Sequence, residues 1–306
     1  IQAAIAHHRA TGEDRLLNVA RRFADLICDT FGKEDEANGQ QAGVPGHPEI
    51  EMALVALARL TGESRYREQA AYFVNARGHG LLGGRAYYVD HVPFREMTRL
   101  AGHAVRALYL CAGAADLYTE TGEAALREAV DHLWETMVAR QLYITGGVGS
   151  RHSGESFGAP FELPNARAYA ETCAGIGVVM WAWRMLQLGG DPRYADVMER
   201  ALYNAVLPGI SLDGKHYFYD NPLAVSPENA ASARRRDWFT CACCPTNIAR
   251  LLAMIPGYIY SVEEAGVWVH LYAANAAQLT LPDGREIALI QRTRYPWSGQ
   301  ITVDVL

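Results

Sequence analysis

Apolar residues recur at helical spacing along most of the chain, and four similar polar turns interrupt them. The turns are ATGEDR at 10–15, LTGESR at 60–65, ETGEAAL at 120–126 and a looser copy, LGGDPR, at 188–193. Glycine supplies the positive φ that ends a helix, and an acidic residue suits the first turn of the next helix. Each copy therefore predicts a helical hairpin.

The connections between the hairpins favour a closed α/α barrel over an open solenoid. Two of them, NARGHGLLGGRAYYVDHVPF and YITGGVGSRHSGESFGAPFELPN, are long and rich in glycine, proline and aromatic residues. Solenoid repeats are joined by shorter connectors, whereas loops of this kind usually line a pocket. The chain is therefore predicted to be mainly α.

From about Gly266 the period changes to that of strands. The segments VWVHLYAANAAQLTL, REIALIQRTRYPW and GQITVDVL alternate and are rich in β-branched residues, and Asp283-Gly284 predicts a hairpin turn. We therefore expect an (α/α)6 barrel in residues 1–263, incomplete at its N-terminus, and the truncated beginning of a β-sandwich domain in residues 264–306. The first residue lies inside a helical pattern and the last inside a strand pattern, which suggests an internal piece of a longer protein.

Composition argues against three other classes of protein. The formal net charge is −6 and the one basic run is Arg234 to Arg236, so nothing favours nucleic acid. No apolar run reaches the ~18 residues of a membrane span. Six cysteines are too few for a disulfide scaffold in 306 residues, and Cys28 and Cys111 fit helical patterns as small core residues. We expect no nucleic acid or membrane partner and a cytoplasmic location.

Unusual polar residues lie near the start of the first helix of several predicted hairpins. They are His47, His103, Glu171 and Cys173, each 14 to 18 residues ahead of the turn that closes its hairpin. In a barrel these first helices form the inner ring, and their N-termini converge at one mouth. Any one of these residues could be an ordinary buried polar group, but several in one layer favour a shared site.

The stretch CACCPTN at 241–247 adds thiols to the same layer. Pro245 suits the first residue of a helix, so Cys244 is expected close to the N-cap and Cys243 just outside the helix. The cysteines are too crowded for mutual disulfides. Zn²⁺ prefers four sulfur, nitrogen or carboxylate ligands in tetrahedral order, although this spacing differs from the usual CxxC pair. The predicted zinc ligands are Glu171, Cys173, Cys243 and Cys244.

A metal-bound thiolate beside a helix N-terminus is deprotonated at neutral pH, which makes it a candidate nucleophile as well as a ligand. A proton donor would then complete the chemistry. Glu155, in the glycine-flanked loop SGESFG, is the best candidate, with an ordinary exposed loop glutamate as the alternative.

These motifs resemble glycoside hydrolase family 127, the β-L-arabinofuranosidases. The matching segments run from IQAAIAHHRATG through PGHPEIEMALVALARLTG, REMTRLAGHAVRALYLCAGAADL, YITGGVGSRHSGESFG, FELPN, YAETCAGIG and YFYDNPL to CACCPTN. The resemblance implies a catalytic α/α barrel followed by β-sandwich domains. It also implies a zinc ion held by the four ligands named above, with Cys243 as the nucleophile and Glu155 as the acid/base.

The resemblance extends to the sugar-binding residues. It implies that His47 and His103 contact the sugar, that Tyr219 does the same, and that Cys241 lies close to the metal. A further sugar-binding histidine of the family would fall before residue 1. The expected function is a retaining glycosidase that releases β-L-arabinofuranose from the non-reducing ends of small or oligosaccharide arabinosides. A homodimer is one of the assemblies that the sequence allows.

Three other functions fit parts of the pattern. A zinc-dependent prenyl transferase would need clustered basic residues for a diphosphate, and only Arg234 to Arg236 are at hand. A sugar epimerase on a similar barrel would leave CACC unexplained. A carbohydrate-binding barrel with a purely structural zinc remains, because closed four-ligand sites are usually structural.

Overall fold

The computed structural model describes residues 1–33, 39–230 and 233–306. Its described residues are mainly helical, and they confirm the four predicted hairpins, each with a left-handed glycine at its turn. The paired helices are α1 (Gln2–Thr11) and α2 (Arg15–Thr30), α3 (Ile50–Thr61) and α4 (Ser64–Ala76), α5 (Ala104–Thr121) and α6 (Ala124–Arg140), and α7 (Thr172–Gly189) and α8 (Pro192–Ala201).

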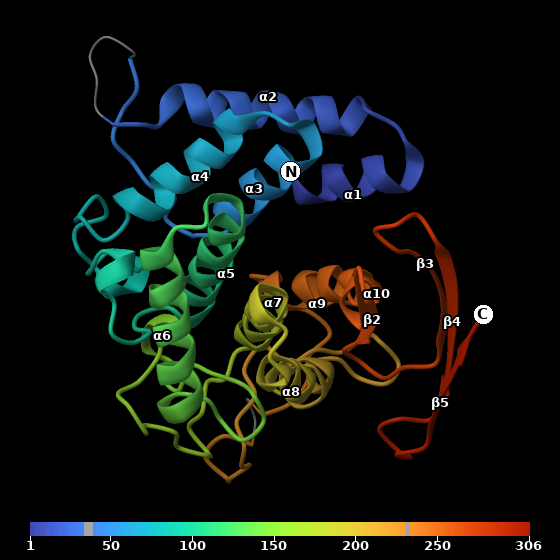
Figure 1. Ribbon diagram of the computed structural model, residues 1–306. Helices are drawn as coiled ribbons and strands as arrows, with labels where there is room; N and C mark the ends of the chain where they lie inside the picture. Colours follow the sequence, from blue (N-terminus) through green and yellow to red (C-terminus); the bar gives the residue numbers. More distant parts are fainter. Residues whose placement is uncertain (34–38, 231–232) are drawn as a thin grey trace.

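The first helices of the hairpins pack side by side in chain order. Helix α3 contacts α1 and α5, and α7 contacts α5 and α9 (Cys243–Met254); Figure 1 shows this succession from blue to orange. Helices α5 and α7 are buried around most of their circumference, whereas α2 buries one face, formed by Leu17, Ala20, Ala24 and Cys28. An inner and an outer helical layer result, which is the arrangement of the predicted α/α barrel.

Helix α9 begins two residues earlier than predicted. Its first residue is Cys243, and Pro245 is its third rather than its first. Proline is tolerated there because the first N–H groups of a helix have no intrahelical partner. Cys243, expected just outside the helix, is therefore part of its first turn.

The strands form two small antiparallel sheets. Strands β1 (Tyr260–Glu263) and β2 (Gly266–Val269) pair with each other, and β3 (Asn275–Thr280), β4 (Glu286–Thr293) and β5 (Ile301–Val305) form a second sheet in that order. The turn at Asp283-Gly284 is confirmed, with Thr280 opposite Glu286 and Gly284 at φ 85°. The sequence pattern missed β1, a four-residue strand that follows the single helical turn α10 (Pro256–Ile259). The domain boundary at 263/264 stays a prediction.

The two isolated cysteines lie within helices, as their sequence pattern predicted. Cys28 and Cys111 are buried in the helical core, as expected. Among the residues that the structure describes, no helix combines the length and the apolar character needed to cross a bilayer.

Candidate active site and metal centre

A cavity of about 620 Å³ opens where the inner helices begin. Its wall includes His47 just before α3, His103 at the N-cap of α5, Glu171 at the N-cap of α7 and Cys243 in the first turn of α9. The predicted convergence of inner-helix N-termini at one mouth is therefore confirmed. The other lining residues are Glu49, Tyr87, Val105, Arg106, Tyr109, Glu155, Cys173, Tyr219, Cys241, Thr246, Asn247 and Arg250.

The four predicted metal ligands come together although about 70 residues separate the two pairs. One donor atom from each of Glu171, Cys173, Cys243 and Cys244 lies within 4.8 Å of all the others. The Sγ atoms of Cys173 and Cys244 are 3.4 Å apart, and those of Cys243 and Cys244 are 3.9 Å apart. Glu171 Oε1 lies 3.8 Å from Cys243 Sγ and 3.5 Å from Cys244 Sγ.

These separations suit a tetrahedral cation. Ligands placed about 2.3 Å (sulfur) and about 2.0–2.2 Å (oxygen) from a tetrahedral zinc ion stand about 3.5–3.8 Å from one another. The second oxygen of Glu171, Oε2, is buried without a hydrogen-bond partner in the described structure. A buried carboxylate with an unpaired oxygen beside three thiols is a donor set that a soft or borderline divalent cation would satisfy.

The electrostatics of the cluster agree with that fit. Burial raises the pKa of the Cys244 thiol and of the Glu171 carboxyl, so both hold protons more tightly than usual. Hydrogen bonds with Cys173 and Cys244 lower the pKa of Cys243, so its thiol gives up a proton more readily than the other two. A bound cation would displace the remaining protons, because thiols and carboxyls ligate metals in their anionic forms.

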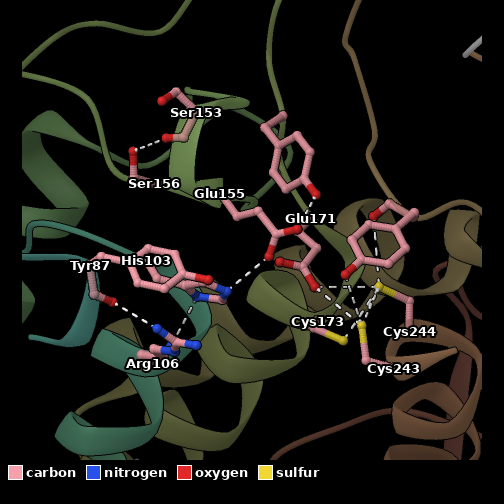
Figure 2. A network of polar contacts seen from close by, with 12 residues as sticks. Tyr87, His103, Arg106, Ser153, Glu155, Ser156, Glu171, Cys173, Cys243 and Cys244 are labelled. Carbon is pink, nitrogen blue, oxygen red and sulfur yellow. Dashed lines mark hydrogen bonds and ion pairs between the residues drawn. The ribbon is translucent and has the colours of Figure 1, made fainter. Parts of the chain in front are cut away.

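Glu155 projects from a tight turn on the wall facing this cluster (Figure 2). It ends the 3-10 turn Ser153–Glu155 at φ 49°, and Ser156 Oγ donates to the Ser153 carbonyl at 2.8 Å, which closes the turn. Its Oε1 accepts from Tyr169 Oη at 2.8 Å, and its Oε2 lies 2.8 Å from His103 Nε2. These hydrogen bonds, that of His103 first, lower the pKa of Glu155.

The tautomer of His103 follows from its other nitrogen. Nδ1 accepts the backbone N–H of Arg106 at 3.4 Å, so Nε2 carries the proton and donates to Glu155. One carboxylate oxygen of Glu155 also lies within 4.8 Å of a Glu171 oxygen. Glu155 and Cys243 Sγ therefore border the same cavity, each next to Glu171.

The remaining predicted site residues also reach the cavity. Tyr219 Oη lies 3.1 Å from Cys243 Sγ, and its hydrogen bond contributes to the lowered pKa of that thiol. The ring of His47 packs edge-on against that of His103, with centroids 5.8 Å apart. Cys241 is exposed and lines the wall, but its donor atom is outside the four-atom cluster found among the described residues.

Sequence reasoning missed several residues of the wall, and it also missed Tyr169, which lies outside the lining and donates to Glu155 Oε1. Asn247 follows Cys243 by four positions, so helical spacing could have placed both side chains on one face of α9. Tyr169, two residues before Glu171, carried no signal of its own because sixteen tyrosines are spread along the chain. Tyr87 and Arg106 meet only in the folded chain, where the guanidinium stacks on the Tyr87 ring at 4.1 Å and donates to its carbonyl.

Comparisons with known proteins agree with one another. Residues 1–257 match a family model described as the catalytic domain of the GH127 beta-L-arabinofuranosidases. The chain is similar to the non-reducing end beta-L-arabinofuranosidase of Bifidobacterium longum subsp. longum, with 37% identity over 334 aligned positions that cover 100% of this chain and 50% of that protein.

Solved structures give the same result. A GH127 beta-L-arabinofuranosidase from Geobacillus stearothermophilus T6 superposes with a TM-score of 0.92 at 43% identity, over 99% of this chain and 51% of that one. A second GH127 beta-arabinofuranosidase superposes with a TM-score of 0.91 at 42% identity, over 99% of this chain and 46% of that one. The chain thus spans about half the length of the relatives it matches.

Proposed function

The chain belongs to glycoside hydrolase family 127, and from this premise we propose that it removes β-L-arabinofuranose from the non-reducing ends of arabinosides, with retention of configuration. The observation that carries the proposal is the pairing of two groups in one cavity. The Cys243 thiolate is half-buried beside a carboxylate–thiol cluster, and Glu155 borders the same space. A nucleophile and a proton carrier on one cavity wall are what double displacement needs.

Zinc is the proposed metal of this site. Glu171, Cys173, Cys243 and Cys244 would hold it, which matches the three-sulfur, one-oxygen donor set and its spacing. When bound, the ion supplies charge that keeps the Cys243 sulfur anionic and weakly basic.

In the first step, Cys243 Sγ forms a bond to the anomeric carbon as the bond from that carbon to the leaving oxygen breaks. Glu155 gives its proton to the departing oxygen. In the second step, the ionised Glu155 takes a proton from water, and the water oxygen displaces the sugar from sulfur. The thiolate and the Glu155 proton are thereby restored. Two displacements at one carbon return the original configuration.

Three further residues are proposed to orient the ring. His47 and His103 pack against each other in the cavity wall, and Tyr219 lies against Cys243. His103 also donates to Glu155, so the same ring can align the acid and pack against the sugar. Orienting the sugar would explain why polar side chains lie at the ends of inner helices that are otherwise apolar.

Substitution of the two reacting groups tests the mechanism. Cys243→Ser and Glu155→Gln should each abolish hydrolysis of an aryl β-L-arabinofuranoside. Zinc should remain bound in Glu155→Gln, because Glu155 is outside the four-ligand set. Full activity in Cys243→Ser would refute the thiolate role.

A carbohydrate-binding barrel with a structural zinc is the second candidate, favoured by the closed four-ligand geometry. A haloacetamide-bearing arabinofuranose separates the two functions. The enzyme would lose activity as a covalent adduct forms on Cys243, detected by peptide mass spectrometry. A purely structural thiolate would stay unlabelled while the protein still binds sugar.

A further inference from the structure

A second cavity, of about 470 Å³, adjoins the catalytic one. Tyr219 and Cys241 line both cavities. Tyr169, whose hydroxyl donates to Glu155 Oε1, forms part of the wall of the second cavity. Because Tyr219 Oη also lies 3.1 Å from Cys243 Sγ, the two cavities meet beside both of the proposed reacting groups.

Two arginines of the one basic run line this second cavity, which we call the arginine pocket. They are Arg234 and Arg236. Arg236 is fixed by an antiparallel bridge to Tyr217. Arg235 between them takes another direction, and its Nε donates to the carbonyl of Pro208 at 2.9 Å. The basic run, to which the sequence assigned no role, therefore contributes two of its three side chains to the pocket.

The charge of these two arginines is only partly balanced. Within the part of the chain that the structure describes, neither guanidinium makes an ion pair or a side-chain hydrogen bond. Asp220 is the one carboxylate among the described residues that line the pocket, and the charge of Arg236 acts on it. In the catalytic cavity, by contrast, Arg250 is paired with Glu49. The arginine pocket is therefore left with an excess of positive charge.

Aromatic rings form much of the remaining wall. Trp238 is 58% exposed, and its ring meets that of Tyr217 edge-on with centroids 6.3 Å apart. The ring of Phe239 packs edge-on against Tyr219 at 5.4 Å, and the guanidinium of Arg236 lies 6.0 Å from its centroid. Exposed aromatic faces stack on other rings, and a guanidinium binds a carboxylate through two parallel hydrogen bonds. The pocket thus suits a ring that carries a carboxylate.

We propose that the arginine pocket receives the leaving group of the glycoside and favours one in which a ring carries a carboxylate. This inference rests on the proposed function, in which Glu155 protonates the departing oxygen. That oxygen has to lie next to Glu155, and the leaving group then extends past Tyr169 into the pocket. A uronic acid and a hydroxylated aromatic acid share this chemistry, and the experiment separates them.

Matched substrates test the preference for charge. The kcat/KM is measured on 4-carboxyphenyl β-L-arabinofuranoside and on its 4-carbamoylphenyl analogue, and the acid-to-amide ratio is compared between proteins, so that differences in leaving-group reactivity cancel. We expect Arg234→Gln and Arg236→Gln each to lower this ratio about three- to ten-fold, and the double variant to lower it further. The wild-type ratio should also fall as salt is added. Equal ratios in wild type and the double variant would overturn the inference.

A second pair of substrates identifies the source of the carboxylate. One is an arabinofuranose linked to glucuronic acid, and the other is the same arabinofuranose linked to glucose. If the two arginines set the ratio for the sugar pair and not for the aryl pair, the pocket takes uronic acids. The reverse result assigns it to aromatic acids, and dependence in both pairs means that the carboxylate alone is recognised.

Two control variants locate the leaving group. Arg99 lines a third cavity, of about 630 Å³, which shares Tyr87 with the catalytic one. If Arg99→Gln lowers the acid-to-amide ratio and Arg234→Gln does not, the leaving group lies in that cavity and the inference is wrong. Trp238→Ala removes a stacking surface, so it should lower kcat/KM on acid and amide alike without changing their ratio. Arg234 and Arg236 are exposed, so Tm and zinc content should stay at their wild-type values when either is replaced.

Failure of this inference differs from failure of the proposed function. If wild type hydrolyses none of the four glycosides, the proposed function is wrong, and the assignment of the arginine pocket falls with it. If wild type hydrolyses them with an acid-to-neutral ratio that does not depend on the two arginines, the proposed function stands and only the assignment of the pocket is wrong.

Discussion

Glu155 is the residue whose surroundings constrain the chemistry most. Two donors, His103 Nε2 and Tyr169 Oη, hold its two oxygens at 2.8 Å each and lower its pKa. A carboxyl with a lowered pKa is protonated only under acidic conditions. A general acid at this position should therefore work best at acidic pH, and kcat/KM should fall as the pH rises through the pKa of Glu155.

The pH profile of a His103 variant tests this constraint. Removing the donor in His103→Ala should raise the pKa of Glu155 towards its ordinary value. The protonated acid then persists to higher pH, and the descending alkaline limb of kcat/KM should move to higher pH even though overall activity drops. His103→Gln, whose amide can donate to Glu155, should leave the limb near its wild-type position.

A control and a contrary result complete this experiment. His132 is exposed on α6 and lies outside the cavity lining, so His132→Ala should change neither the height nor the shape of the profile. A limb that stays in place in His103→Ala would mean that another group sets the alkaline descent, and the acid role of Glu155 would lose its support.

At the scale of elements, the loops before the inner helices are held by a buried arginine. Arg77, the residue that follows α4, is 1% exposed. Its guanidinium donates to the carbonyl of Pro45, in the loop that carries His47, and to that of Tyr88 at 2.7 Å. Arg77 thus joins two cavity-lining loops from behind without touching the cavity.

Replacing Arg77 should loosen both loops. Arg77→Met keeps most of the volume but leaves two carbonyls without their donor, so we expect a loss of about 2–4 kcal/mol in the free energy of unfolding. KM should rise more than kcat falls, because the side chains proposed to contact the sugar lose their placement while the proposed reacting groups keep theirs. Arg85→Met, an exposed change in the same loop, should affect neither Tm nor KM strongly. A normal KM with a lowered Tm would limit Arg77 to a structural role.

The sequence predicted elements better than contacts between them. Glycine in the turn at each hairpin and the change of period near Gly266 are local signals, and they located the helices and most strands. The cysteines of CACC and the Glu-Thr-Cys segment could be identified as a candidate site from the sequence, because thiols and carboxylates are rare on apolar helices. The partners of Glu155 did not stand out, because Tyr169 and the Nε2 tautomer of His103 become meaningful only once the chain has folded.

At the scale of the whole molecule, the cluster of candidate metal ligands joins elements that are far apart in the chain. Two of its residues come from the N-terminus of α7 and two from the first turn of α9. Between them runs a long segment that passes through α8 and returns to the cavity at Tyr219. A cation bound there would tie the last hairpin to the following inner helix and hold the nucleophile against the cavity wall.

Metal removal should therefore cost stability as well as activity. A ligand that binds only the folded state stabilises it by mass action, so a chelator that strips the ion should lower Tm by several degrees. Cys173→Ala should lose the ion outright and reach a similar Tm without chelator. The gap between metal-bound and metal-free protein should widen from about pH 5 to about pH 8, because protons compete with the cation for sulfur. Calorimetry with metal analysis measures both quantities. An unchanged Tm in protein shown to have lost its metal would mean that α7 and α9 hold together without it, and the centre would then serve catalysis alone.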